Sequence, residues 1–212
     1  MQNARRMIVD MSSLLWQSLL AGKDEEYGIT VEFEGKQFHV NSYHHGYECA
    51  MNHLTSVMEQ LNIVPTQMIF VVEGKHSKTR RKAMYERYKE GSGRPEECYT
   101  NFNILKDMLI KVFRSVGATF VSQDGVESDD VIAYLVRRLK GEKIIVSRDG
   151  DLCALLSNDV IQVRNGQLTI DNPYGNFPPK YITTYKAVVG DSSDKLSGAP
   201  GFGETAFSKL LD

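Results

Sequence analysis

The chain has 212 residues, of which 42% are hydrophobic and 25% charged, which excludes a disordered or low-complexity protein and allows a buried core. Apolar runs such as MIFVV are too short to span a bilayer, and no secretory leader precedes them, so we expect a cytoplasmic protein. Three widely spaced cysteines argue against a disulfide framework or a thiolate zinc site, and the net charge of -2 gives no overall attraction to nucleic acid.

Short apolar segments alternate with segments of helical period along the chain. The segments typical of buried strands are RRMIVD (5–10), QMIFVVE (67–73), ATFV (118–121) and KIIVSRD (143–149). Apolar residues spaced three or four apart predict helices within 47–61, 102–116, 131–139 and 181–188. This alternation predicts an α/β fold with a largely parallel central sheet flanked by helices on both faces.

Two hairpins and one linker complete the predicted organisation. Hairpins are expected within 30–40 and 159–170, and Asn165-Gly166 in the second is a strong signal for a type I′ turn. PYGNFPPK, which begins at Pro173, is the clearest linker. We therefore expect a core over residues 1–172 and a separate C-terminal element over 173–212.

Acidic residues gather where ligands bind in such folds. Asp10, Glu73 and Asp149 end three predicted strands, and the carboxyl ends of parallel strands meet at one edge of the sheet. The blocks GVESDD, RDGD and GDSSD contribute further carboxylates, namely Glu127, Asp129, Asp130, Asp151, Asp191 and Asp194. Each block by itself is typical of an acidic helix start or a polar turn. Their convergence would be repulsive unless cations neutralised it, and all-oxygen ligands favour Mg²⁺, with Mn²⁺ as a substitute.

The remaining charge predicts a polyanionic substrate. Nine of the 27 acidic residues belong to the positions above, so bases outnumber acids in the rest of the chain. Lys75 to Arg94 alone carries eight Lys or Arg against two Glu. Such a run is usually a solvated helix and loop, but here it follows the strand that leads to Glu73 and is expected to lie over the acidic crevice.

The blocks GVESDD, RDGD and GDSSDKLSGAPGFG resemble the signature blocks of the 5′-nuclease family, which comprises flap endonucleases and 5′ to 3′ exonucleases. The family includes bacteriophage replication nucleases and the nuclease domain of bacterial DNA polymerase I, and the resemblance runs from Asp10 to about Phe207. It implies a PIN-like core that holds two divalent ions. The first metal group would be Asp10, Glu73, Glu127 and Asp129 with Asp130 alongside, and the second Asp149, Asp151, Asp191 and Asp194. Glu73 stands where the family usually has Asp, which leaves its direct contact with an ion open.

The resemblance also implies roles for the basic segment and the glycine-rich turn. Residues 75–100 would form the arch above the active site, in which Lys89 contacts the scissile phosphate and Arg94, with Arg80 or Arg81, holds neighbouring phosphates. Tyr85 and Tyr88 would stack on unpaired bases. SGAPGFGETAFSKLL resembles a helix-hairpin-helix whose Gly201 and Gly203 let DNA phosphates approach the backbone and which binds K⁺ in relatives. Lys195 departs from the family's common Asn, and the chain ends where relatives continue, as a truncated or minimal version would.

These features together predict a structure-specific 5′-nuclease that hydrolyses DNA by a two-metal mechanism in replication or repair. The nearest alternative is a PIN-domain ribonuclease, which would share the acidic crevice without needing the arch or hairpin. Another is a non-catalytic DNA-binding scaffold of the same fold. DNA against RNA, and exonuclease against flap endonuclease preference, stay open at this point, as does the oligomeric state.

Overall fold

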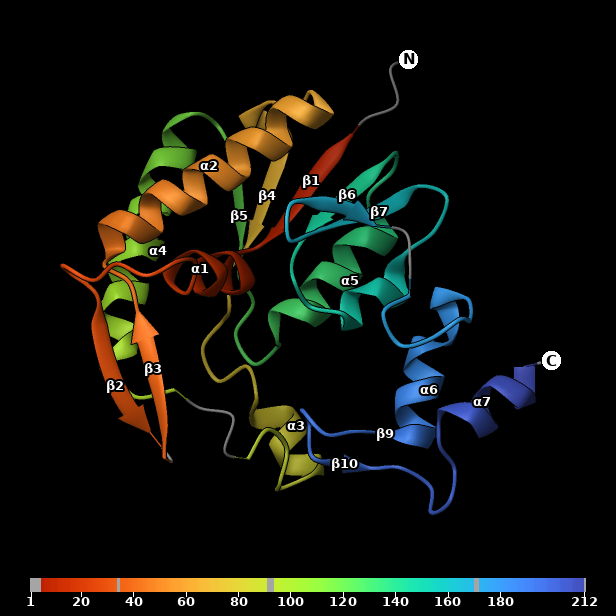
Figure 1. Ribbon diagram of the computed structural model, residues 1–212. Helices are drawn as coiled ribbons and strands as arrows, with labels where there is room; N and C mark the ends of the chain where they lie inside the picture. Colours follow the sequence, from red (N-terminus) through yellow and green to blue (C-terminus); the bar gives the residue numbers. More distant parts are fainter. Residues whose placement is uncertain (1–4, 34, 91–93, 170–171, 212) are drawn as a thin grey trace.

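The computed structural model describes residues 5–33, 35–90, 94–169 and 172–211, and its centre is a six-stranded sheet in the order β5-β4-β1-β6-β7-β8 (Figure 1). The strands are β1 (Arg6–Asp10), β4 (Met68–Val71), β5 (Thr119–Val121), β6 (Lys143–Val146), β7 (Val160–Arg164) and β8 (Gln167–Thr169). Neighbouring strands from β5 to β7 are parallel, and β8 is antiparallel to β7. The predicted α/β fold with a largely parallel sheet is confirmed.

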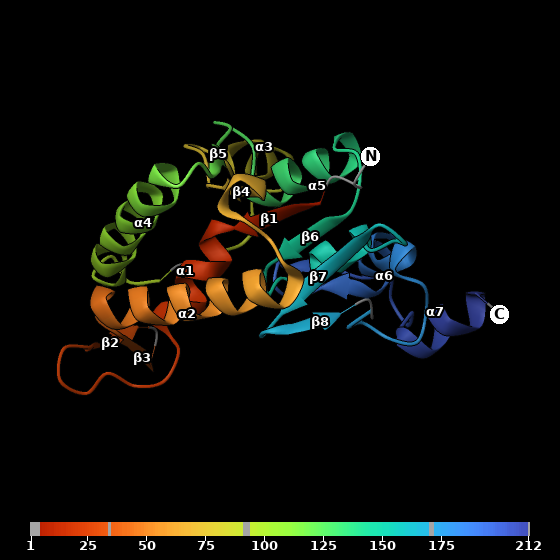
Figure 2. The same ribbon diagram turned by 90° about the horizontal axis from the view of Figure 1, so that it is seen from above.

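Helices cover both faces of this sheet, as Figure 2 shows. Helices α1 (Met11–Leu19), α2 (Tyr43–Leu61) and α4 (Cys98–Ser115) pack on one face, and α5 (Ser128–Arg138) on the other. Successive side chains of β1 point to opposite faces of the sheet. Met7 and Val9 therefore join the apolar cluster on one face, and Ile8 joins the cluster on the other. Strands buried on both faces need near-continuous apolar sequence, which RMIVD, MIFV and KIIV provide.

Both predicted hairpins are present. β2 (Ile29–Phe33) pairs with β3 (Lys36–Val40) between α1 and α2, and β7 pairs with β8. Asn165 and Gly166 both have positive φ, 51° and 76°, as a type I′ turn requires. The predicted end of the second hairpin at Ile170 lies outside the described residues.

A smaller apolar cluster joins the C-terminal element to the rest. The element contains η3 (Pro179–Tyr181), α6 (Ile182–Val189), β9 (Gly190–Asp191), β10 (Leu196–Ser197) and α7 (Glu204–Leu211). Phe177, Ile182 and Phe207 pack with Cys153 of the short helix η2 (Asp151–Leu155). Two helices around a glycine-rich turn are compatible with a helix-hairpin-helix, which stays a prediction, as does a domain boundary near residue 172.

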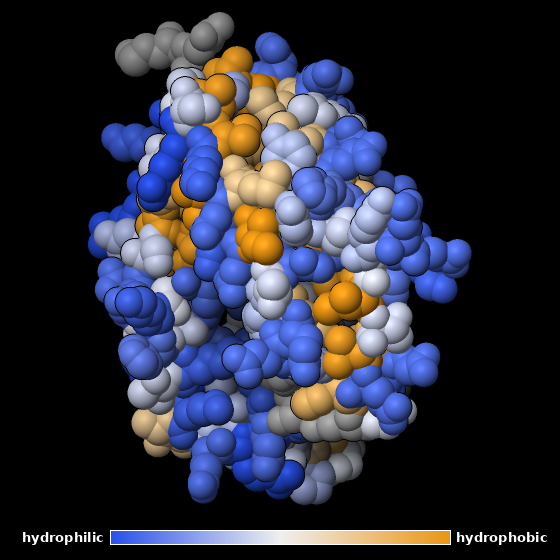
Figure 3. Space-filling model, turned by 90° about the vertical axis from the view of Figure 1, so that its left-hand side faces the viewer, coloured by the Kyte–Doolittle hydropathy of each residue, from blue (hydrophilic) through white to orange (hydrophobic). Residues whose placement is uncertain are grey.

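The surface is largely hydrophilic on the side that carries the β2-β3 hairpin. Figure 3 shows small groups of apolar side chains separated by hydrophilic ones on this side. Among the described residues, no helix is both long and apolar enough to cross a membrane. The remaining secondary-structure elements of the described residues are the short helices η1 (Pro65–Gln67) and α3 (Thr79–Met84).

Phe70 is expected to be a main contributor to stability. It is fully buried on β4, and its ring lies 4.8 Å from those of both Phe113 and Phe120. We predict that Phe70→Ala lowers the free energy of unfolding by about 3–5 kcal/mol, measured by urea denaturation. Tyr134→Ala, at a side chain that is 59% exposed, should change it by less than about 0.5 kcal/mol. Equal losses in the two variants would contradict this view of the core.

Candidate metal-binding and nuclease site

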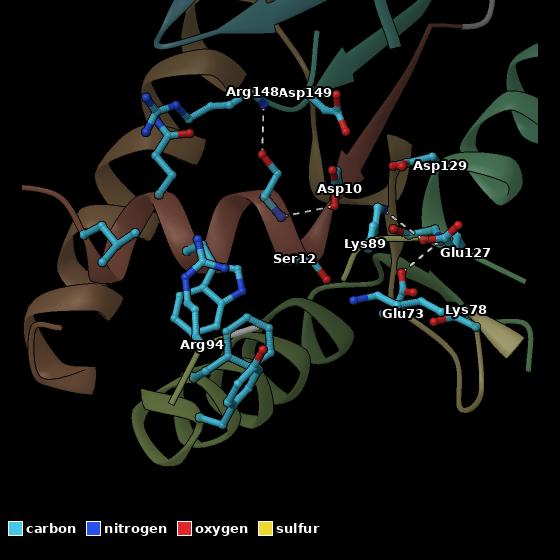
Figure 4. A pocket seen from close by; sticks show the side chains of 18 residues that line it. Asp10, Ser12, Glu73, Lys78, Lys89, Arg94, Glu127, Asp129, Arg148 and Asp149 are labelled. Carbon is cyan, nitrogen blue, oxygen red and sulfur yellow. Dashed lines mark hydrogen bonds and ion pairs between the residues drawn. The ribbon is translucent and has the colours of Figure 1, made fainter. Parts of the chain in front are cut away.

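The order of the strands brings three predicted acids to one crevice. β1 lies between β4 and β6, so Asp10 at the end of β1 stands between the chain that leaves β4 toward Glu73 and the chain that leaves β6 toward Asp149. Glu127 and Asp129 enter the same crevice from the start of α5. The crevice has a volume of about 650 Å³ (Figure 4). The structure therefore brings together five of the nine predicted metal-binding carboxylates.

Asp10 is held in place by hydroxyl and backbone groups. It is the N-cap of α1 and accepts a hydrogen bond from the Ser13 N–H, at 3.1 Å. The Ser147 hydroxyl donates to its other oxygen at 2.8 Å. Burial nevertheless raises the pKa of Asp10 to about 6, with smaller contributions from Asp149 and Glu73. These hydrogen bonds orient the carboxylate without removing the cost of its charge.

The pKa of Asp129 is raised even further than that of Asp10. Burial raises the pKa of Asp129 to about 8, and the charges of Asp149 and Asp10 act in the same direction. Burial also raises the pKa of Asp149. In Figure 4 the carboxylates of Asp10, Asp129 and Asp149 lie around the same opening. Positive charge placed among them would remove both the repulsion and the desolvation cost.

Glu127 is instead paired with basic and hydroxyl groups. It is 3% exposed, and it forms ion pairs with Arg81 at 2.7 Å and Lys89 at 3.0 Å. The Tyr88 hydroxyl also donates to it, at 2.9 Å. Glu127 thus anchors the basic segment to the wall of the crevice.

Glu73 lies beside the start of the neighbouring helix. It accepts a hydrogen bond from the Ser128 N–H at 2.9 Å and so helps to cap α5.

Asp130 and Arg80 lie outside the crevice. Both line a second, smaller pocket together with Arg81, whose guanidinium pairs with Asp130 at 2.9 Å. Arg81 thus forms ion pairs with both Glu127 and Asp130. Asp130 is exposed there and does not line the main crevice with Asp129. Its expected place beside the first metal group therefore does not match the structure.

Two acids of the second predicted metal group form ion pairs with a lysine. The ammonium of Lys186 on α6 pairs with both Asp151 and Asp191. Although burial acts against protonation, these two carboxylates raise the pKa of Lys186 above its ordinary value. Asp191 also accepts a hydrogen bond from the Ser193 N–H at 2.9 Å, and Asp194 follows in the same turn. The single positive charge of Lys186 thus offsets part of the repulsion between Asp151 and Asp191.

The two acidic groups differ in how well they suit a divalent ion. Within the described ranges, no three acidic, histidine or cysteine side chains are close enough to hold one ion as they are placed. The first group consists of oxygen donors of the type that Mg²⁺ and Mn²⁺ prefer, and the raised pKa values of Asp129 and Asp10 show that their present neighbours offset only part of the cost of their charge. The first group therefore fits a divalent ion, whereas Asp151 and Asp191 fit one only if Lys186 leaves them.

Tyr88 is placed differently from the base-stacking role expected for it. Its side chain is buried, with 5% exposure, and its hydroxyl lies between Arg81 and Glu127. The ring therefore supports Arg81 and Lys89, whose charged groups lie 5.6 and 5.2 Å from its centroid. Tyr85 donates from its hydroxyl to the Lys195 carbonyl at 2.8 Å, which joins the basic segment to the turn before β10. Residues 91–93 of the expected arch lie outside the described residues.

An aromatic wall forms the other side of the crevice. The Arg94 guanidinium lies 4.1 Å from the centroid of the Trp16 ring, which in turn contacts Phe102 at 4.8 Å and Tyr99 at 5.3 Å. All four residues line the crevice. Trp16 is thus both packed against the core and part of the site's surface. Arg94 faces the crevice, as its expected role beside the active site requires.

Two backbone conformations explain features of the glycine-rich turn. Gly201 has φ of 75°, a region that favours glycine, whereas Gly203 is not in that region and has open space beside it. Lys195 has φ of 60°, and asparagine tolerates this left-handed conformation better than lysine does. The family's common Asn at this position therefore has a conformational reason.

Three residues that matter here were missed in the sequence. Lys186 lies one turn or more before Asp191 on a predicted helix, where a single lysine has no distinctive signal. Ser147 precedes the RDGD block, and its hydroxyl donates a hydrogen bond to Asp10. Gln162 is a polar residue in an apolar strand, and its side-chain amide donates to the Asp149 carbonyl within the RDGD block. A buried-strand pattern interrupted by glutamine was the one available sign, because buried amides need partners.

Comparison with known protein families assigns most of this chain to one family. The family profile described as "5'-3' exonuclease, N-terminal resolvase-like domain" matches residues 5–183. The chain belongs to this family. A 5'-3' exonuclease of Mycoplasmopsis pulmonis is 31% identical over 168 residues, which cover 75% of this chain and 54% of that relative. The chain thus spans about half the length of this member of the exonuclease family.

Two solved structures of T5 nucleases have a fold similar to that of this chain. The structure of the T5 5'-exonuclease with bound zinc has a TM-score of 0.72 and 18% identity, and covers 98% of this chain and 74% of that one. A bacteriophage T5 flap endonuclease variant in a pseudo-enzyme-product complex with DNA and metal ions has a TM-score of 0.70 and 17% identity, with the same coverage. At these identities the similarity establishes the fold.

The raised pKa of Asp129 makes the metal-free protein sensitive to pH. The pKa is about 8 in the folded state against an ordinary value of 3.8, so the folded protein holds this proton more tightly than the unfolded chain. The free energy of unfolding should therefore fall as pH rises from about 4 to 8. We predict that Asp129→Asn melts at a higher temperature than wild type in EDTA, by about 2–4 °C for each kcal/mol gained.

The difference between the two proteins should grow from pH 5 to pH 8, because over this range the folded wild-type protein keeps the Asp129 proton that the unfolded chain has released. His53, whose lowered pKa results from burial, changes stability in the opposite direction but does so in both proteins and cancels. A difference in melting temperature that is the same at pH 5 and pH 8 would contradict the proposed burial of the Asp129 charge.

Proposed function

We propose that this protein is a metal-dependent 5′-nuclease that hydrolyses phosphodiester bonds of DNA near a free 5′ end or a flap, in replication or repair. The observation that carries the proposal is the group formed by the buried Asp10 and the half-buried Asp129 and Asp149, beside which Lys89 lines the same crevice. Membership of the 5'-3' exonuclease family supports the reaction, and the DNA complex of the T5 flap endonuclease supports the substrate.

The carboxylates that line the main crevice would hold the divalent ion; they include Asp149, which the resemblance assigned to the second metal group. Asp10, Asp129 and Asp149 provide oxygen ligands, with Glu127 and Glu73 at the edge of the group, and hard ions such as Mg²⁺ or Mn²⁺ prefer these donors. When bound, such an ion lowers the pKa of a water and stabilises charge on a phosphoryl oxygen. Ser13 and Ser147 keep Asp10 oriented toward the ion's position through the hydrogen bonds described above.

The two-ion arrangement implied by the resemblance remains a prediction. Lys186 already supplies one positive charge to Asp151 and Asp191, so we derive no reaction step through a second ion. In this arrangement the second group still contributes to the reaction by fixing the turn that contains Asp191 and Asp194. A K⁺ ion at the glycine-rich turn is a further part of the proposal, and the sharp backbone at Gly201 supports it.

Lys89 would neutralise charge on the reacting phosphate. Its ammonium lies 3.0 Å from Glu127 in the crevice, a position from which it can pair with an incoming phosphate. Its backbone φ of 52° costs on the order of 1 kcal/mol for a residue other than glycine. The contacts of Lys89 and Tyr88 with Glu127 offset this cost and hold the ammonium at the site.

The basic segment and the aromatic wall would bind the polyanionic strand. Arg80 and its exposed neighbours on α3 lie beside the crevice, and Arg94 lies within it against Trp16. Positive charge attracts phosphates of any sequence, which suits recognition of a DNA end rather than of a base sequence. Of the two tyrosines, Tyr85 is the half-buried one and keeps the expected role of contacting the strand.

Removing one carboxylate from the main crevice should strongly slow cleavage. We predict that Asp149→Asn lowers the single-turnover rate on a 5′-flap DNA in Mg²⁺ by on the order of 100- to 1,000-fold, with the fold retained. The control is Asp107→Asn, an exposed acid on α4 that should cleave at the wild-type rate. Parallel assays on blunt duplex, single-stranded DNA and RNA, each with Mg²⁺ and with EDTA, define the substrate. Metal-independent cleavage, or full activity of Asp149→Asn, would contradict the proposal, and preference for RNA would favour the ribonuclease alternative.

Lys89 should affect the reaction more than binding. We predict that Lys89→Ala lowers the single-turnover rate on the flap by about 100-fold while its affinity for the same DNA in Ca²⁺ changes by less than about threefold. Lys82→Ala, at an exposed lysine of α3, serves as the matched control for lost positive charge. A loss of affinity with an unchanged rate would make Lys89 a docking residue instead.

A further inference from the structure

A fully buried amide lies directly behind the crevice. Gln162 is on β7 with no exposed surface, among the apolar strand residues Val160, Ile161 and Val163. Its backbone is paired with Ile145 of β6, the strand that leads into the RDGD turn. Burying an amide is costly unless its hydrogen bonds are made, so its partners are the reason for its presence in this strand.

Both amide hydrogens of Gln162 are used by that turn. Its Nε2 group donates to the Ser147 carbonyl at 2.9 Å and to the Asp149 carbonyl at 2.7 Å. Its Oε1 accepts from the Cys153 thiol at 3.2 Å. The two carbonyls bracket the residues where the chain leaves β6 and directs Asp149 into the crevice. A single side chain thus fixes both ends of this short segment.

The other side of the same turn is bonded to Asp10 and its helix. The Ser147 hydroxyl donates to Asp10 and accepts from the Asp149 N–H at 3.0 Å. The Arg148 N–H donates to the Ser13 hydroxyl at 2.8 Å. The turn is therefore held between Gln162 on the sheet side and the Asp10 network on the crevice side. Asp149 depends on both sets of bonds for its position.

We propose that Gln162 is a positioning residue, which fixes the backbone from Ser147 to Asp149 so that the Asp149 carboxylate stays beside Asp10 and Asp129. This inference rests on the proposed metal-dependent function. Without the amide, two carbonyls would be left without their donor, and the turn would be free to rotate Asp149 away from the other acids. Residues that orient metal ligands in this way typically change metal affinity by about 10- to 100-fold when they are replaced.

The test replaces the amide with an apolar side chain of similar length. We predict that Gln162→Met weakens Mn²⁺ binding to the metal-free protein by about 10- to 100-fold, measured by calorimetry. The Mg²⁺ concentration that gives half-maximal cleavage of the flap should rise by a similar factor, while saturating Mg²⁺ restores part of the rate. Val160→Ala is the matched control, because it removes buried volume from the same strand without touching the turn. It should bind Mn²⁺ within about twofold of wild type although it is less stable.

A second variant and the behaviour of the wild-type protein make the result decisive. Should Gln162→Met fail to fold, Gln162→His retains a single N–H donor and should show a smaller loss of Mn²⁺ affinity in the same direction. Wild-type Mn²⁺ affinity in either folded variant, or an equal loss in Val160→Ala, would overturn the positioning role. A wild-type protein that binds Mn²⁺ but cleaves no nucleic acid would contradict the proposed function while leaving the Mn²⁺ comparison valid. A wild-type protein that binds no Mn²⁺ would contradict both.

Discussion

The repulsion among buried carboxylates at the ends of β1 and β6 is the constraint on which the rest of the site depends. A parallel sheet places Asp10 and Asp149 together, and α5 adds Asp129, whose pKa rises to about 8 as a result of burial and these neighbours. A protein optimised for stability alone would not keep three such acids in one crevice. Their retention at a cost in stability is the physical sign of a site designed to receive positive charge.

The fold neutralises its two acidic groups in different ways. In the second group the ammonium of Lys186 pairs with Asp151 and Asp191 and offsets part of their repulsion. In the first group Lys89 and Arg81 pair with Glu127 rather than with Asp10, Asp129 or Asp149. The basic segment is thus anchored at Glu127, on the wall of the crevice. The carboxylates of Asp10, Asp129 and Asp149 can therefore still be stabilised by a bound cation.

The sequence was sufficient for elements whose signals are local. The apolar runs of β1, β4 and β6 and the Asn165-Gly166 turn predicted strands and a hairpin that are confirmed, because burial on two faces and positive φ leave direct traces in residue type. The parallel order then implied that Asp10, Glu73 and Asp149 would meet at one edge. It could not show that Asp130 pairs with Arg81 beside a different pocket, or that Tyr88 is buried, since both depend on how the basic segment packs on α5.

The amino-acid sequence by itself thus determined the fold class, the crevice and the family, because strand periodicity, turn residues and ordered acidic blocks are properties of short segments. Only the tertiary structure decided which charge neutralises which. Lys89 and Glu127 are 38 residues apart and Lys186 and Asp151 are 35 apart, and such pairs leave no periodic pattern. The same holds for Gln162, whose two hydrogen bonds to the turn exist because β6 and β7 are adjacent strands. The physical reason is that ion pairs and buried hydrogen bonds depend on side-chain reach across packed elements, which the chain specifies only once it has folded.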